Sequence, residues 1–234
     1  KHHGSVIRKL DAHTLSMDIR LKTGVLHAES RLLVRLHGGT LSGDSTGITV
    51  TGADSATLYL VARTSFVSYK DVSGDPAAGC ARDLGSLDDM HYTRVKAAHI
   101  GDYRRYFDTF SIDLGHTDDE RRPTDERIAR FDTHPDPALV ALYVQYARYL
   151  LISSSRPGTL PPNLQGIWND EMRPPWGSKY TTNINLEMNY WPAEVLNLSP
   201  CTEPLSRMMQ RLAVTGHQTA GDYYGCTGWV LHHN

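Results

Sequence analysis

Apolar and polar positions in the first 66 residues alternate in short runs that are typical of β-strands. Four runs are rich in Val, Ile, Leu, Thr and Tyr: residues 16–21, 31–36, 47–51 and 57–63. Turn clusters that contain glycine separate them, which favours short antiparallel strands packed as a β-sandwich. The next segment, residues 69–86, is rich in Gly, Asp and Pro and is therefore predicted to be a loop.

Helical spacing replaces this alternation after the loop. Residues 88–106 carry a loosely amphipathic pattern that predicts a helix. We then expect a short strand at residues 111–114, a charged and solvated connector at 116–122, and a short helix over 125–131 with Thr124 as its cap.

The C-terminal part of the chain predicts three longer helices. Asp136 in the cap position and Pro137 in the first helical position mark the start of the first helix. The second helix begins at about Asn185, and Pro192 is expected to break or kink it.

The third helix is predicted over about residues 202–224, with an interruption at Gly216 and an end at Gly225. Between the first and second helices, residues 156–179 contain five prolines and three glycines. This segment is too long and too aromatic to be a passive linker, so we expect an ordered loop.

Composition narrows the class of protein. A hydrophobic fraction of 40% and a charged fraction of 21% over 234 residues are those of a globular protein. The net charge of −2 provides no basic surplus for nucleic acid, and no apolar run is long enough to span a membrane. Three widely spaced cysteines without a CxxC pair favour free thiols, although one disulfide remains open.

Tryptophan and asparagine are concentrated in the C-terminal part. All four tryptophans lie at or after residue 168, and no asparagine precedes residue 163. Aromatic faces stack on the C–H groups of sugar rings, and amides donate to and accept from sugar hydroxyls. This composition indicates either a sugar site or a long loop held in place by Trp and Asn, and by itself it leaves both open.

Two asparagines are candidate site residues, Asn183 and Asn185. An amide does not titrate, so it cannot act as a general base, but it can orient a water molecule. The alternative for Asn183 is helix capping, which the residues alone favour. The nearby carboxylates, Asp170, Glu171, Glu187 and Glu194, show no spacing that identifies an acid–base pair.

The chain ends in two adjacent histidines followed by Asn234. Neighbouring residues point in different directions, so His232 and His233 do not have metal-ligand spacing, and we expect no metal. The chain also lacks GxSxG, Walker and GxGxxG motifs, which gives no support to a serine hydrolase or a nucleotide-binding site.

Three long motifs carry a family resemblance. They are SSSRPGTLPPNLQGIWND, PPWGSKYTTNINLEMNYWPAEVLNLS and GWVLHHN, and upstream segments such as HIGDYRRYFDTFSIDLG extend the match. Together they resemble glycoside hydrolase family 95, the inverting α-L-fucosidases with some α-L-galactosidases. The resemblance covers about residues 57–234.

The resemblance implies an α+β multidomain architecture. Residues 1–86 would be the end of an N-terminal antiparallel β-sandwich domain and residues 87–135 a helical linker. Residues 136–234 would be the first helices of an (α/α)6 catalytic barrel. Only about a third of such a barrel would then be present, so we expect a fragment of a longer enzyme that is inactive alone.

The resemblance also implies roles for individual residues. Asn183 and Asn185 match the asparagines that hold the nucleophilic water, whereas the acid Glu and an acidic partner would lie beyond Asn234. Thr181, Trp176, His232 and His233 would contact the sugar.

Thr181 stands where many members have His, and the Thr form resembles members linked to L-galactosides. One pocket residue can decide such specificity. We therefore expect fucosylated or L-galactosylated glycans as partners, with no cofactor, no nucleic acid and no membrane span.

The resemblance favours an extracellular or periplasmic location. The rivals are an α-L-galactosidase, a carbohydrate-binding protein without catalysis, and a structural α+β protein whose Trp and Asn side chains only pack.

Overall fold

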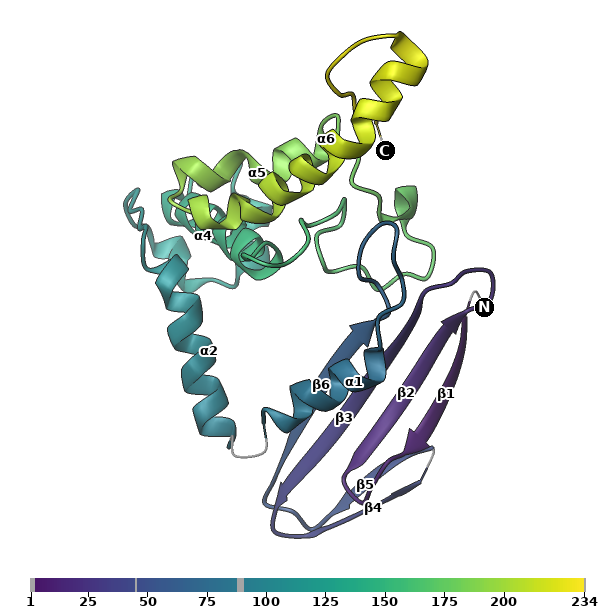
Figure 1. Cartoon of the computed structure of the whole chain (residues 1–234). Coiled ribbons are helices and arrows are strands. Elements are labelled where there is room, and N and C mark those ends of the chain that lie inside the picture. The colour runs from purple at the N-terminus through teal and green to yellow at the C-terminus, as the bar shows by residue number, and fades with distance from the viewer. Residues whose placement is uncertain (1–2, 45, 88–90, 234) are drawn as a thin grey trace. The chain divides into compact units, whose positions relative to one another are not determined.

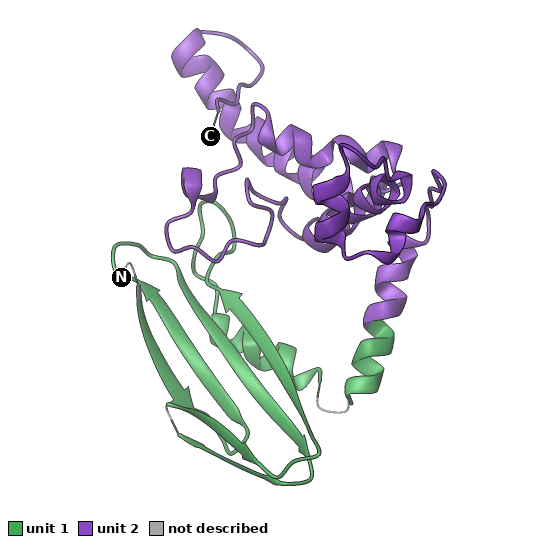
Figure 2. Cartoon of the chain, turned by 180° about the vertical axis from the view of Figure 1, so that it is seen from behind, with its two compact units in different colours: residues 1–98 green, residues 99–234 purple. Residues whose placement is uncertain are grey.

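The computed structural model describes residues 3–44, 46–87 and 91–233. The chain forms two compact units, residues 1–98 and residues 99–234 (Figure 2). Strands dominate the first unit and helices the second, so the predicted α+β class is confirmed. The finer division into a β domain, a linker and a barrel stays a prediction.

A four-stranded antiparallel sheet, in the order β1-β2-β3-β6, forms most of the first unit (Figure 1). Two further strands, β4 and β5, pair separately as a hairpin. The four predicted runs are confirmed as β2, β3, β5 and β6, whereas β1 and β4 were not expected. The bounds are β1 His3–Lys9, β2 Thr14–Leu21, β3 His27–His37, β4 Thr40–Asp44, β5 Gly47–Thr51 and β6 Ser55–Thr64.

The loop predicted over residues 69–86 is wrong in its second half, which forms helix α1 (Pro76–Gly85). The Asp75 side chain caps this helix by accepting from the Ala78 N–H, and Pro76 occupies its first turn, where a missing N–H costs nothing. The helix packs against β3, where the buried Cys80 thiol donates to the Glu29 carbonyl. Its Ala- and Gly-rich sequence lacks a strong apolar stripe, which is why periodicity did not reveal it.

The remaining part of the chain is helical. The helices are α2 Tyr92–Phe107, α3 Thr124–Arg130, α4 Pro137–Ser154, α5 Asn185–Val195 and α6 Glu203–Tyr224, with 3-10 turns η1 Asp118–Arg121, η2 Pro175–Ser178 and η3 Ser199–Thr202. All predicted helices are confirmed, although residues 88–90 of the first lie outside the described residues.

Two local predictions differ from the structure. Residues 111–114 form no strand. The connector at 116–122 is mostly exposed, as predicted, and contains the η1 turn. Thr124 is the first residue of α3, which follows Pro123, so Thr124 does not cap it. Asp136, in contrast, caps α4 as predicted by accepting from the Leu139 N–H at 2.9 Å.

Neither helix is broken at the expected position. Helix α5 continues through Pro192 to Val195, and α6 runs without a break through Gly216. Gly225 has a φ of +60° and ends α6, as the sequence predicted.

A small apolar core joins α4, α5 and η3, and its buried members are Leu151, Ile152, Leu186, Tyr190, Ala193, Leu198 and Cys201. Beside this core lies the fully buried Arg148, which donates to the carbonyl oxygens of Tyr106, Phe107 and Leu196. Its guanidinium thereby satisfies the last carbonyls of α2 and the end of α5. This arrangement fixes the position of α5, which begins at the candidate Asn185, two residues after the candidate Asn183.

All three cysteines are free, as expected, and only Cys226 is exposed. No helix among the described residues has the length and apolar character needed to cross a membrane.

Candidate active site

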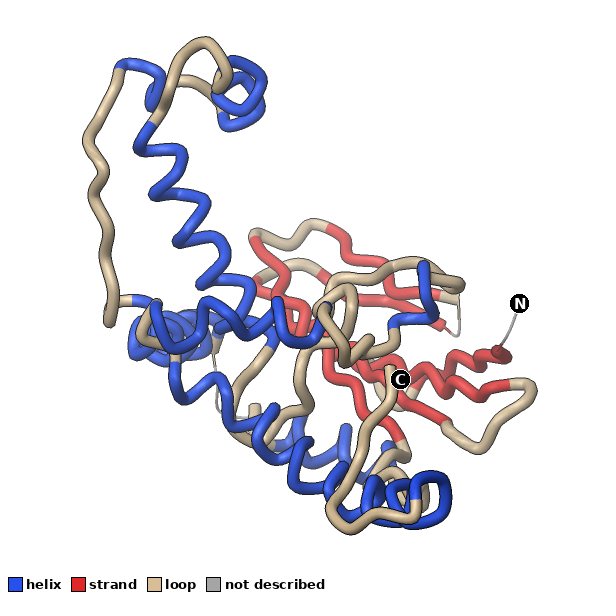
Figure 3. The backbone as a smooth tube through the Cα atoms, turned by 90° about the horizontal axis from the view of Figure 1, so that it is seen from above, coloured by secondary structure: helices blue, strands red, loops and turns tan. Residues whose placement is uncertain are grey.

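The segment that follows α6 folds back along that helix, as the chain path in Figures 1 and 3 shows. The Val230 N–H donates to the Gly216 carbonyl at 3.2 Å, and His217 Nδ1 pairs with the Gly228 carbonyl at 2.8 Å. This close approach requires a glycine, since a Cβ at position 216 would lie 2.5 Å from the Val230 oxygen. Residues 225–233 are called the return segment below.

The return segment meets the loop that leads into α5. The Thr182 N–H donates to the His233 carbonyl at 2.9 Å, and its hydroxyl donates to the His232 carbonyl at 2.8 Å. At the other side, the Tyr224 hydroxyl pairs with His232 Nε2 at 2.8 Å. Thr182 and Tyr224 were not singled out from the sequence, because no local pattern shows which distant residues they contact.

These contacts bring two predicted site residues together. Asn183 Oδ1 lies 2.7 Å from His233 Nδ1, although the two residues are 50 positions apart. An amide oxygen only accepts, so the ring nitrogen must donate. Asn183 does not cap α5, because Ile184 is the N-cap residue and no side chain fills the cap position. The capping alternative for Asn183 is therefore wrong.

Asn185 and Thr181 flank the same loop. Asn185 is the first residue of α5, and its half-buried side chain makes no hydrogen bond within the described part of the chain. Thr181 is only 3% exposed, and its hydroxyl donates to the Tyr180 carbonyl. Its φ of +47° is rare for a β-branched residue, and strained backbone of this kind often occurs at functional sites.

No hydrogen bond within residues 91–233 joins Trp176 to Asn183 or His233 either. Trp176 is 73% exposed and, like Ser178, has a positive φ. Three of the four non-glycine residues described with positive φ therefore lie in the six positions from Trp176 to Thr181. The segment that leads to Asn183 therefore has an unusual backbone conformation, which its hydrogen bonds must stabilise.

The loop over residues 156–179 is ordered by its own hydrogen bonds, as expected. The Leu164 N–H donates to the Lys179 carbonyl, and Asn189 of α5 donates to the Asn163 carbonyl at 3.2 Å. Asn189 thus anchors the loop, whereas the four tryptophans remain between 47% and 73% exposed. Amide and backbone contacts thus hold the loop, and the tryptophan side chains leave indole surface exposed.

Three carboxylates in the helical part are held in their ionised form by hydrogen bonds. Hydrogen bonds from Arg105 to Asp102, from Arg127 to Asp136, and from the Gly158 N–H to Glu203 lower the pKa of each carboxyl. Every resolved shift of a carboxyl pKa in the described residues is downward: Asp11, Asp44, Asp71, Asp83, Asp102, Asp136 and Glu203. A general acid must hold its proton near the working pH, so a lowered pKa disfavours these seven carboxyls for that role.

Within the described ranges, no three His, Cys, Asp or Glu side chains gather to hold a metal ion. The site therefore consists of oriented amides, imidazoles and hydroxyls. Such groups can position a water molecule and bind sugar hydroxyls.

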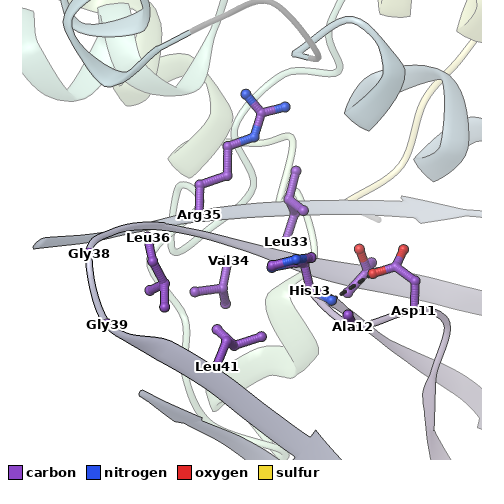
Figure 4. A pocket seen from close by; sticks show the side chains of 11 residues that line it. Asp11, Ala12, His13, Leu33, Val34, Arg35, Leu36, Gly38, Gly39 and Leu41 are labelled. Carbon is purple, nitrogen blue, oxygen red and sulfur yellow. Dashed lines mark hydrogen bonds between the residues drawn. The ribbon is translucent and has the colours of Figure 1, made fainter. Parts of the chain in front are cut away.

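A hollow lies in the β unit, apart from the Asn183 site, with a volume of about 760 Å³ (Figure 4). Its walls include Leu33, Val34 and Leu41. The Asp11 carboxylate there accepts the His13 backbone N–H at 2.7 Å, which lowers the pKa of Asp11. This carboxylate serves a local turn, so the hollow lacks the convergent polar groups of the Asn183 site.

Comparisons with known proteins identify the family of the chain. The family model described as "Glycosyl hydrolase family 95 catalytic domain" matches residues 91–234. The chain is 42% identical over 218 residues to Alpha-L-fucosidase 2 of Arabidopsis thaliana, which covers 88% of this chain and 26% of that protein.

Two fungal proteins named probable alpha-fucosidase A are also similar. The Aspergillus niger protein is 42% identical over 147 residues, covering 60% of this chain and 18% of the relative. The Aspergillus oryzae protein is 34% identical over 198 residues, covering 79% and 27%. The chain thus spans about a quarter of the length of the curated relatives it matches. The match to the catalytic-domain model covers more than half of the chain, which belongs to glycoside hydrolase family 95.

Proposed function

We propose that this chain is part of a glycoside hydrolase that removes terminal α-L-fucosyl residues from glycans with inversion of configuration. The observation that carries the proposal is the contact of the Asn183 amide with His233, where a loop of strained backbone meets the return segment. The names of the relatives, Alpha-L-fucosidase 2 and probable alpha-fucosidase A, supply the sugar. Fucosylated glycans are accordingly the proposed partners.

The proposed reaction needs a water molecule on one face of the sugar and an acid on the other. Asn183 and Asn185 would orient the water, because amides accept and donate without titrating. The acid would be a carboxyl group that protonates the departing glycosidic oxygen, and a second carboxylate would activate the water. The two groups would lie about 6.5–9.5 Å apart, which leaves room for the water between them. In this proposal both carboxyl groups come from chain outside these residues, as the family resemblance implies.

The surrounding residues have roles in the same proposal. Trp176 offers an exposed indole face for stacking on the sugar, and His232 and His233 line the same loop. Outside these residues, the helices would continue into an (α/α)6 barrel, and the β unit would be part of a sandwich domain. The 234 residues alone would be inactive, and the enzyme would act outside the cytoplasm, where such glycans occur.

An α-L-galactosidase is the second candidate, and Thr181 favours it. L-Galactose is L-fucose with one hydroxyl added at C6, so it needs extra room. Thr181 is small and buried, and its hydroxyl is already bonded to Tyr180, so it would not fill that room. A carbohydrate-binding protein would show sugar affinity without turnover.

The test uses the longer polypeptide of which these 234 residues are a part, called the whole polypeptide below. Its substrates are an aryl α-L-fucoside and the α-L-galactoside with the same aryl group. We expect Asn183→Ala and Asn185→Ala to lower kcat by about 100-fold or more, because misplaced reacting groups cost that much. The control is Asn169→Ala, since Asn169 is exposed and bonds only to Glu171. Faster L-galactoside turnover would favour the second candidate, and unchanged kcat in both asparagine variants would contradict the proposed roles.

A further inference from the structure

The contact between His233 and Asn183 has a chemical direction. A primary amide has two ends of nearly equal shape, one of which accepts while the other donates. Asn183 presents Oδ1 to His233 Nδ1 at 2.7 Å, and the Asn183 side chain has no other hydrogen bond within the described residues. The imidazole is therefore the group that selects which end of the amide faces the ring.

We propose that His233 is a positioning residue, whose Nδ1–H holds the amide of Asn183 in one of its two flipped orientations; this rests on the proposed function, in which Asn183 orients the attacking water.

The tautomer of His233 decides the orientation of the amide. A neutral ring with hydrogen on Nδ1 donates to Oδ1, and so does the doubly protonated ring. A neutral ring with hydrogen on Nε2 would present a lone pair at Nδ1, and the amide would turn its Nδ2 hydrogens toward it. The amide would then offer the reversed pattern to a water molecule.

The backbone holds His233 at this place. Thr182, the residue before Asn183, donates from its N–H to the His233 carbonyl and from its hydroxyl to the His232 carbonyl. Tyr224 pairs with the His232 ring, and the Val230 N–H is bonded to Gly216 of α6. These contacts carry the ring of His233 to Asn183, and its own hydrogen bond completes the alignment.

A fixed amide would matter for the rate more than for binding. Oδ1 has two lone pairs, of which the His233 Nδ1–H uses one. The other lone pair and the Nδ2 hydrogens remain to hold a water molecule in one constant direction. Without the ring, the amide would sample both orientations, and a water held by the wrong end would not point its lone pair at the anomeric carbon.

Two substitutions separate this role from a simple structural one. The side-chain nitrogen of Asn can occupy the place of His Nδ1, whereas that of Gln corresponds to Nε2. His233→Asn therefore keeps a donor beside Asn183, and His233→Gln removes it. Both variants lose the ring and its volume, so each is the control for the other.

The experiment measures both geometry and kinetics in the whole polypeptide. Neutron diffraction from crystals exchanged into heavy water would show deuterium on His233 Nδ1 and Oδ1 of Asn183 facing it. In α-L-fucoside hydrolysis, His233→Gln should lower kcat by about tenfold or more with little change in KM, because a misdirected amide affects the reacting geometry. His233→Asn should recover part of that loss, because it can place a donor beside Asn183, although its own amide can also turn its oxygen there.

Three results would overturn the proposal. One is an unprotonated His233 Nδ1 that faces Asn183 Nδ2 in the neutron structure. Another is an equal loss of kcat in both variants with a raised KM, which would mean that His233 contacts the sugar. The third is wild-type kcat in His233→Gln. If the unchanged polypeptide hydrolyses no α-L-fucoside, the proposed function fails, while the deuterium positions still decide whether His233 fixes the amide.

Discussion

Replacing Gly216 by alanine tests whether the return segment is held against α6 as the structure shows. Gly216 is buried, and a Cβ built on it would lie 2.5 Å from the Val230 oxygen and 3.2 Å from the Val230 nitrogen. An ordinary carbon–oxygen contact is about 3.3–3.6 Å, so the segment would have to move by close to 1 Å. The atoms in the way are backbone, which cannot rotate aside.

The magnitude follows from two opposing effects. Alanine in a helix interior stabilises the folded state by roughly 0.5–1 kcal/mol relative to glycine. Overfilling a packed site costs about 1–3 kcal/mol. Gly221 lies in the same helix with no atom within 4 Å of its Cβ position. Gly221→Ala should therefore gain the helix stabilisation without the cost of overfilling. The two variants should differ in free energy of unfolding by about 1–3 kcal/mol.

Urea unfolding of both variants and the unchanged chain, followed by circular dichroism, measures this difference. We expect Gly221→Ala to be more stable than the unchanged chain and Gly216→Ala to be less stable than Gly221→Ala. Equal stabilisation by both substitutions would refute the reasoning, because it would mean that no backbone lies against Gly216. The His233 contact with Asn183 would then lose its structural basis.

Three further predictions concern the helical part. Arg148→Ala should lower the free energy of unfolding by about 3 kcal/mol or more in urea titrations, because the carbonyls it satisfies would be buried without partners. The hydrogen bond from Arg127 lowers the pKa of Asp136 in the folded state, so the unchanged chain should be more stable than Asp136→Asn. This difference should be constant above the unfolded-state pKa of about 3.9 and should shrink as the pH falls through the folded-state pKa of Asp136. Thermal melting at a series of pH values would measure it. Burial raises the pKa of Tyr190 to about 12, so Tyr190 should contribute little tyrosinate absorbance at about pH 11. The free energy of unfolding should fall as the pH rises from about 10 to 12, because only the unfolded state loses this proton readily. Ionisation of Tyr190 together with the exposed tyrosines would contradict this.

Local signals in the sequence predicted many of the elements. Strand alternation located β2, β3, β5 and β6, and Asp136 with Pro137 marked the start of α4. Helix α1 was missed because its ten residues lack an apolar stripe, although Asp75 followed by Pro76 was a usable start signal. Pro192 suggested a break in α5, but the helix continues through it.

The site could be predicted only in part. The motifs identified Asn183 and His233, but no periodicity relates residues 50 positions apart. Their pairing depends on a glycine at position 216 and on Thr182, whose roles appear only when the chain has folded. The same limit holds for Arg148, since a lone arginine in an apolar helix does not indicate which carbonyls it will satisfy.

The most direct test of the proposed activity is to follow, by proton NMR, the anomer of the sugar that the whole polypeptide first releases from an aryl α-L-fucoside. Attack by a water held at Asn183 and Asn185, on the face opposite the leaving group, predicts that β-L-fucose forms first and that Asn183→Ala slows its formation. Release of α-L-fucose first, or no release of L-fucose, would contradict the account.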